Sequence, residues 1–292
     1  MDFGSLITAM VTPFDAAGEV DESKLRPLVD HLINTGTTAI VAVGTTGESP
    51  TLTHDEKLRV FDATLKAVDG RIPVLAGTGS NATRESVQLT IEAARLGVQG
   101  ILLVAPYYNR PSQDGLYAHF TTVAESTTLP IMIYNVPART GVNIQAETVL
   151  ELSNVPNIVA LKEAHSDFSQ ILHIAAEKPD DFLLYCGDDK LTLPMLSVGA
   201  AGVVSVASHV VGRQMRTMMD LFWQGQTDEA AYWSGRLLPI FEAMFATASP
   251  APLKEALSII GLDVGSVRAP LVPASSALRE HLVTLLNRLG EV

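Results

Sequence analysis

The sequence predicts a (β/α)8 barrel of the TIM type with a helical C-terminal extension. Eight short apolar runs recur between residues 6 and 206, rich in Val and Ile and lacking the polar alternation of a sheet with one wet face. Amphipathic helical periods separate them, and parallel strands need such crossover connections. An open doubly wound sheet stays as the alternative, because a strand count alone does not establish closure.

The predicted strands are short and spaced along the chain at intervals that leave room for one helix each. They cover residues 6–11, 39–43, 74–76, 101–104, 131–134, 158–161, 182–186 and 203–206. Continuous apolar runs of this kind are typical of strands that are covered on both faces.

Several helix ends can be located from the sequence. Asp21 is an N-cap candidate, and Gly36 ends the helix that follows it. Thr53 and Glu56 have the spacing of a capping box, and a third helix stops at Gly97. Weaker helical patterns cover residues 113–126, 145–152, 167–177, 190–198 and 210–224.

No Pro/Gly/Ser-rich linker divides the chain of 292 residues. We therefore expect a catalytic barrel over residues 1–225 and a helical region over residues 226–292, with two or three helices packed on the barrel. A single (β/α)8 unit of this length is common.

Composition and charge exclude several classes of protein. Twenty Lys and Arg against 32 Asp and Glu give a net charge of −12, which repels nucleic-acid phosphates. No apolar run is long enough to cross a bilayer, and residues 1–5 lack the basic region of a signal peptide. The single cysteine, Cys186, excludes an intramolecular disulfide and fits a reducing compartment. We expect a cytoplasmic protein with no nucleic-acid or membrane partner.

In this architecture catalytic side chains stand at the carboxyl ends of the strands, and Lys162 occupies such a position. At pH 7 only about one free lysine in 10³ is the neutral amine that attacks a carbonyl. Burial raises that fraction and makes a lysine a Schiff-base nucleophile. The alternative is a lysine that reaches solvent or pairs with Glu163.

Tyr134 ends the neighbouring predicted strand, where a phenol can move protons to and from an imine. A tyrosine that only packs its ring is the alternative. The segment Gly44-Thr45-Thr46-Gly47-Glu48-Ser49 follows the second strand, and its backbone N–H groups can converge on a carboxylate. It is not a P-loop, since no Gly-Lys-Ser/Thr follows.

Two further loops carry candidate binding residues. Arg139 presents a guanidinium suited to a carboxylate, unless it is simply a solvated loop residue. Tyr107 and Tyr108 follow the fourth strand and can bind substrate or anchor an interface. Asp188 and Asp189 have no nearby third ligand, so we predict a helix cap there and no metal.

Together these segments resemble the dihydrodipicolinate synthase family, pyruvate-dependent class I aldolases related to N-acetylneuraminate lyase. The resemblance covers nearly the whole chain, from about residue 3 to residue 273. The matching segments are Thr8-Ala9-Met10-Val11-Thr12-Pro13-Phe14, Gly44-Thr45-Thr46-Gly47-Glu48, Pro106-Tyr107-Tyr108-Asn109-Arg110-Pro111-Ser112-Gln113, Tyr134-Asn135-Val136-Pro137, Arg139-Thr140-Gly141, Lys162-Glu163-Ala164 and Gly187-Asp188-Asp189.

The resemblance implies a lyase of lysine and diaminopimelate biosynthesis, without metal or organic cofactor, that condenses pyruvate with L-aspartate 4-semialdehyde through a lysine Schiff base. It implies a homotetramer built from two tight dimers. The catalytic roles that the resemblance implies are Lys162 as nucleophile, Tyr134 as proton donor and acceptor, and Thr45 as relay between Tyr134 and a Tyr108 contributed across a subunit interface. For binding, it implies that Arg139 binds the semialdehyde carboxylate and that the Thr45 and Thr46 amides bind the pyruvate carboxylate. Gly187 and Val204 are implied to line the lysine pocket.

Two alternatives remain at this stage. A related sugar-acid aldolase, of the N-acetylneuraminate lyase or 2-keto-3-deoxy-gluconate aldolase type, shares the lysine and tyrosine, but Arg139 favours a second carboxylate. A catalytically silent barrel that binds keto acids is the other.

The resemblance also implies an allosteric lysine site at Ser49, His54, Asn81, Glu85 and Tyr107. Lys57 stands where lysine-inhibited members carry histidine, and its ammonium repels a cationic inhibitor by about 1 kcal/mol. We therefore predict weak or absent inhibition by lysine. His165 also departs from the family pattern, which usually has a small residue after Lys-Glu-Ala. A second departure is the segment Ser249-Pro250-Ala251-Pro252-Leu253-Lys254, where the family more usually begins with Asn-Pro, and the sequence offers no physical account of this change.

Overall fold

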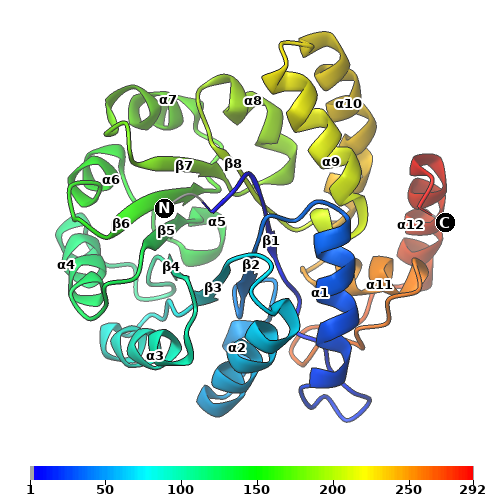
Figure 1. Cartoon of the computed structure of the whole chain (residues 1–292), viewed down its shortest axis with the longest axis horizontal. Coiled ribbons are helices and arrows are strands. Elements are labelled where there is room, and N and C mark those ends of the chain that lie inside the picture. Colours follow the sequence, from blue (N-terminus) through cyan, green and yellow to red (C-terminus); the bar gives the residue numbers. More distant parts are fainter. Residues whose placement is uncertain (1–2, 292) are drawn as a thin grey trace.

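Eight parallel strands close into a barrel in the computed structural model, which describes residues 3–291 (Figure 1). The strand order follows the chain, and β1 pairs with both β2 and β8. This confirms the predicted (β/α)8 barrel and excludes the open sheet. The strands are β1 (Leu6–Ala9), β2 (Ala39–Ala42), β3 (Val74–Gly77), β4 (Gly100–Val104), β5 (Ile131–Asn135), β6 (Ile158–Glu163), β7 (Leu183–Cys186) and β8 (Gly202–Ser205).

Helices surround the barrel and connect successive strands (Figure 1). The predicted capping box of Thr53 and Glu56 begins α2, and Gly97 ends α3 in the left-handed conformation that glycine favours. The crossover helices are α1 (Leu25–Asn34), α2 (His54–Val68), α3 (Thr83–Leu96), α4 (Gln113–Ala124), α6 (Ala146–Leu152), α7 (Phe168–Glu177) and α8 (Thr192–Ser197). The helix α9 (Ser208–Trp223) follows the last strand. The short α5 (Pro137–Thr140) and the 3-10 turns η1 (Glu22–Lys24), η2 (Ser49–Thr51) and η3 (Asp189–Leu191) lie in loops.

Alternate residues of each strand point into the barrel, where they form an apolar core separate from the one under the helices. Met132 and Tyr134 of β5 belong to this interior core, as does Ala160 of β6. By the same alternation Lys162, two residues after Ala160, also enters the barrel at the carboxyl end. The strand extends to Glu163, beyond the apolar run, because Lys162 and Glu163 stay paired with β7.

The C-terminal part of the chain forms α10 (Thr227–Ala243), α11 (Ala251–Ile259) and α12 (Ser276–Leu289), which lie at one side of the barrel beside α1 and α9 (Figure 1). The chain after α11 returns to the barrel, where the Phe14 N–H donates to the Val264 carbonyl at 3.0 Å. Residues 1 and 2 of the predicted barrel region (1–225) and residue 292 of the predicted helical region (226–292) lie outside the residues that the structure describes. Over residues 3–291, no helix is both long and apolar enough to cross a membrane.

Candidate active site

Lys162 and Tyr134 lie opposite each other on neighbouring strands at the barrel mouth. The Lys162 Nζ atom is 4.1 Å from the centroid of the Tyr134 ring, and each residue is 5% exposed. The structure therefore excludes the alternative that Lys162 reaches bulk solvent. The sequence placed both residues at strand ends, and the barrel register makes them neighbours.

Burial changes the protonation of this lysine. It lowers the pKa of Lys162 from its usual 10.5 to about 8; the negative charge of Asp189 opposes this shift and the guanidinium of Arg139 adds to it. A lysine with a pKa near 8 supplies far more neutral amine near pH 7 than a solvated one. The site thus provides a nucleophilic amine at near-neutral pH.

Burial raises the pKa of the Tyr134 hydroxyl to about 12, so Tyr134 enters a reaction as a neutral phenol. The nearby charge of Arg139 and a hydrogen bond with the Thr45 side chain oppose the shift. The phenol is thus an acid that can donate its proton and later recover it. The Thr45 side chain is the hydrogen-bonding neighbour of this phenol.

Space for the lysine depends on Gly187, which follows β7. A Cβ atom at this position would lie 2.8 Å from the Ala164 Cβ and 3.1 Å from the Lys162 Cε. Only glycine fits there without displacing the lysine or its neighbours. Val204 of β8 is buried in the interior core, below the mouth.

The 44–49 turn after β2 is held by its own backbone and by the loop after β1. The Glu48 N–H donates to the Thr45 carbonyl at 3.1 Å, and the Thr12 hydroxyl donates to the Gly47 carbonyl at 2.7 Å. Thr46 is buried. This fixed turn presents Thr45 toward Tyr134.

A cavity of about 210 Å³ opens above these residues. Arg139 reaches it from α5, whose first residue is Pro137, and remains exposed at its rim. The lining combines the 44–49 turn, the ends of β3 to β5 and the following loops: Val43, Gly44, Thr45, Ser49, Pro50, Gly77, Gly79, Leu102, Val104, Tyr107, Tyr134, Val136, Arg139 and Thr140. Thr45 and Tyr134 are among the lining residues, whereas Lys162 is not.

Tyr108 does not join this group in the single chain. It is 88% exposed, its backbone is left-handed with φ of 74°, and its N–H donates to the Thr140 carbonyl at 3.1 Å. Its neighbour Tyr107 lines the cavity. A large exposed aromatic on a strained, hydrogen-bonded loop is a feature of protein interfaces.

The residues expected to bind lysine are only partly gathered. Ser49 and Tyr107 line the cavity, whereas His54 pairs with Glu92 on the helix surface. Asn81 accepts a hydrogen bond at its backbone carbonyl, from Asn109 at 2.8 Å. Glu85 accepts one from Ser80 and acts electrostatically on Lys57, whose pKa is lowered mainly by burial.

Two buried carboxyl groups near the lysine were not found from the sequence as site residues. Asp189, predicted only as part of a helix cap, accepts hydrogen bonds from the Val206 and Ala207 N–H groups at 3.2 and 2.8 Å. Glu163 points away from the barrel interior and accepts from Asn135 Nδ2 and from the His165 N–H. The contacts of Asp189 with the chain after β8, and of Glu163 with Asn135, join residues that are distant in the sequence, so no local sequence signal indicates them.

A closed barrel with a buried lysine of lowered pKa and a phenol beside it, at the carboxyl ends of the strands, is the architecture of a class I aldolase-type enzyme. The comparisons with known proteins narrow this class. Residues 2–289 match the model of the dihydrodipicolinate synthetase family, and the chain belongs to that family.

Similar proteins match over almost their whole length. A 4-hydroxy-tetrahydrodipicolinate synthase of Bacillus subtilis is 51% identical, over 99% of this chain and 100% of its own. The dihydrodipicolinate synthase DapA-2 of Bacillus anthracis is 50% identical with a TM-score of 0.97, covering 98% of each chain. A structure of the enzyme from Cyanidioschyzon merolae with lysine bound is 44% identical, with a TM-score of 0.97 and 99% of each chain covered.

Proposed function

We propose that this protein is a 4-hydroxy-tetrahydrodipicolinate synthase, which condenses pyruvate with L-aspartate 4-semialdehyde in lysine and diaminopimelate biosynthesis. The observation that carries the proposal is the buried Lys162 amine 4.1 Å from the Tyr134 ring at the barrel mouth. The names of relatives about half identical over the full chain support it.

The reaction begins when the neutral Lys162 amine attacks the pyruvate keto carbon. Tyr134 donates a proton to the departing hydroxyl, so that water leaves and a protonated imine forms. Loss of a methyl proton gives the enamine, whose terminal carbon attacks the aldehyde carbon of the semialdehyde. The C=O π bond breaks in this step, and the aldehyde oxygen takes up a proton to become the hydroxyl of the product. The amino group of that substrate then attacks the imine carbon, closes the ring and releases the lysine amine.

The other proposed site residues bind the substrate carboxylates, relay protons or shape the pocket. The Thr45 and Thr46 backbone amides bind the pyruvate carboxylate, and Thr45 passes protons between Tyr134 and a Tyr108 contributed by another subunit. Arg139, at the cavity rim, binds the semialdehyde carboxylate. Gly187 and Val204 shape the pocket around the lysine.

Borohydride reduction in the presence of pyruvate tests the proposal. Mass spectrometry of the digested protein should find the reduced adduct on Lys162. Lys254 is a matched internal control, because it is also buried with a pKa lowered to about 8 but is paired with Glu48. No adduct on either lysine, or an adduct on Lys254 alone, contradicts the proposal.

A panel of acceptor substrates separates the proposal from the sugar-acid aldolases. Aspartate semialdehyde with pyruvate should turn over, whereas N-acetylneuraminate and 2-keto-3-deoxy-gluconate should not be cleaved. Arg139→Met should raise the KM for the semialdehyde and leave the trapping of pyruvate in place. Cleavage of a sugar acid at a higher kcat/KM would favour the other activity.

The proposal includes a homotetramer, a dimer of dimers, in the reducing cytoplasm. The exposed Tyr108 and the single, buried Cys186 support these two points. Analytical ultracentrifugation should give a species of four chains, and Tyr108→Ala should lower kcat in that assembly. A fully active monomer would contradict a role for Tyr108 across the interface.

A further inference from the structure

An ion cluster ties the C-terminal part of the chain to the active-site turn. It consists of Glu48, Glu56, Lys254 and Arg268. The Lys254 Nζ lies 2.8 Å from the Glu48 Oε1, and these side chains are only 3% and 2% exposed. Burying such a pair is costly unless each charge is fully matched, so the arrangement calls for an explanation beyond stability.

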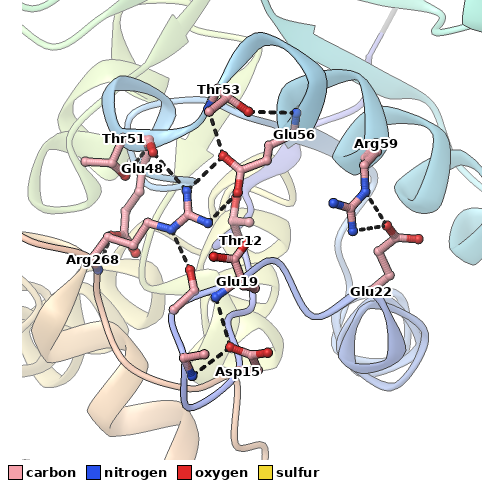
Figure 2. Close-up of polar contacts among 12 residues, drawn as sticks. Thr12, Asp15, Glu19, Glu22, Glu48, Thr51, Thr53, Glu56, Arg59 and Arg268 are labelled. Atoms are coloured by element: carbon pink, nitrogen blue, oxygen red, sulfur yellow. Dashed lines mark hydrogen bonds and ion pairs between the residues drawn. The ribbon is translucent and has the colours of Figure 1, made fainter.

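Arg268 contacts three segments of the barrel at once (Figure 2). Its guanidinium pairs with both carboxylate oxygens of Glu56 at the start of α2. It also donates to the Gly18 carbonyl at 2.7 Å and to the Thr51 carbonyl at 2.9 Å, while its own N–H donates to Glu48 Oε2 at 2.9 Å. Arg268 thus joins the loops after β1 and β2.

Lys254 completes the enclosure of Glu48. Its ammonium also donates to the Ser266 carbonyl at 2.8 Å and lies 4.1 Å from the centroid of the Phe14 ring. The Arg268 guanidinium is 4.4 Å from the same ring. Each oxygen of the Glu48 carboxylate therefore has a partner from the C-terminal segment.

Glu48 is also the residue that closes the 44–49 turn. Its backbone is left-handed, with φ of 57°, a conformation that costs a non-glycine residue free energy and needs support from its surroundings. Its N–H donates to the Thr45 carbonyl, and its carbonyl accepts from the Thr51 N–H. The ion cluster holds the side chain of this residue from both carboxylate oxygens.

We propose that Lys254 and Arg268 are positioning residues of the reaction, which hold the 44–49 turn in its working conformation through Glu48. They contact no substrate; they set the direction of the Thr45 hydroxyl and of the Thr46 amide. The inference rests on the proposed function, in which those two residues bind pyruvate and relay protons. The C-terminal region is then part of the active-site scaffold.

Variants of Lys254 and Glu48 test this proposal. Lys254→Met should lower kcat/KM about 10- to 100-fold, with a raised KM for pyruvate and the borohydride adduct still on Lys162. Lys254→Arg, which keeps the charge, should restore most of the loss. Glu48→Gln should lower kcat/KM similarly, and the Glu48→Gln/Lys254→Met pair should be no worse than either alone.

Glu255→Gln is the matched control, since this neighbour on α11 pairs with the surface residue Arg279. It should leave kcat, KM and Tm near the values of the unchanged protein. If Lys254→Met fails to fold, Glu48→Gln takes its place, because this variant removes the charge and keeps the side-chain shape. Its kcat/KM is then compared with that of Lys254→Arg.

Unchanged kcat/KM in folded Lys254→Met and Glu48→Gln would overturn the proposal. So would losses that disappear when the variants are assayed well below their Tm, since a purely structural role predicts that recovery. Failure of pyruvate trapping in the unchanged protein would instead remove the proposed function itself.

Discussion

Lys162 places its Nζ atom 4.1 Å from the centroid of the Tyr134 ring, across the β5–β6 pair. A ring face attracts the ammonium form, whereas burial disfavours it. Burial prevails, because the pKa of Lys162 falls to about 8. At pH 7 about one amine in ten is then neutral, on the order of a few hundredfold more than for a solvated lysine.

The rate of imine formation should therefore rise with pH and level off above about pH 8. The folded pKa lies below the usual 10.5, so the neutral amine appears earlier than in a solvated lysine. Arg139→Met should move the inflection upward, because the Arg139 charge helps to lower this pKa. Single-turnover trapping of pyruvate between pH 6 and pH 10 measures the pH of this inflection. A rate that is still rising steeply at pH 10 would contradict the burial argument.

Tyr134→Phe should slow turnover about 10²- to 10⁴-fold while leaving Lys162 in place, because only the proton-donating hydroxyl is lost. Tyr185→Phe is the matched control: it removes another hydroxyl from the barrel interior, one that donates to the Gly4 carbonyl at 3.0 Å. That variant should lose about 1 kcal/mol of stability and keep its kcat. Equal kcat in Tyr134→Phe and the unchanged protein would dismiss the proton-transfer role.

Gly187→Ala should disturb the lysine pocket more than the fold. The new methyl group would press on Ala164 Cβ and Lys162 Cε, so we expect kcat/KM to fall by about tenfold or more. Gly235→Ala on α10 is the control, since a Cβ atom there meets nothing within 4 Å, and it should add up to about 1 kcal/mol of stability. Steady-state kinetics and thermal unfolding of both variants make the comparison.

Much of the fold follows from local sequence patterns. The apolar runs located each strand, and the capping box of Thr53 and Glu56 located the start of α2, because both signals lie within a few neighbouring residues. Closure of the barrel did not follow from the strand count. It depends on the pairing of β1 with β8, residues almost two hundred positions apart.

The candidate site likewise has residues that the sequence predicted and contacts that it did not. Lys162 and Tyr134 were predicted as strand-end residues, and the structure adds their contact and their burial. Glu48 was seen only as part of a turn, and Lys254 only within a segment without explanation. Their ion pair joins residues far apart in the chain, so no spacing rule indicates it. Nothing in the structure explains Ser249 in that same segment.

Lys57→His should strengthen inhibition by lysine. In the unchanged protein we expect weak or no inhibition, because the half-buried Lys57 ammonium beside Glu85 repels a cationic ligand by about 1 kcal/mol, or roughly fivefold in affinity. Lys66→His, on the same helix but paired with Asp62 at the surface, is the control and should change nothing. Strong inhibition of the unchanged protein by millimolar lysine in a steady-state assay would contradict this prediction.

The Glu163 carboxyl should make stability depend on pH in an unusual direction. Burial raises its pKa to about 7, although hydrogen bonds from Asn135, His165 and Gln170 oppose the shift. Between about pH 4.5 and pH 7 the folded protein therefore binds this proton more tightly than the unfolded chain does. The stabilisation from Glu163 is fully present below about pH 4.5 and is lost as the pH rises through about 7.

Glu163→Gln removes this titration while keeping the shape of the side chain. The shift corresponds to a stability change on the order of 3 kcal/mol across that interval. Urea unfolding at pH 5 and pH 8 should thus show the unchanged protein losing more stability than Glu163→Gln, by up to about that amount. Other groups, including Glu56 with its pKa lowered to about 2 by Arg268, titrate alike in both proteins and cancel in the difference. Parallel pH profiles for the two proteins would mean that Glu163 is ionised throughout, held so by its hydrogen-bond donors.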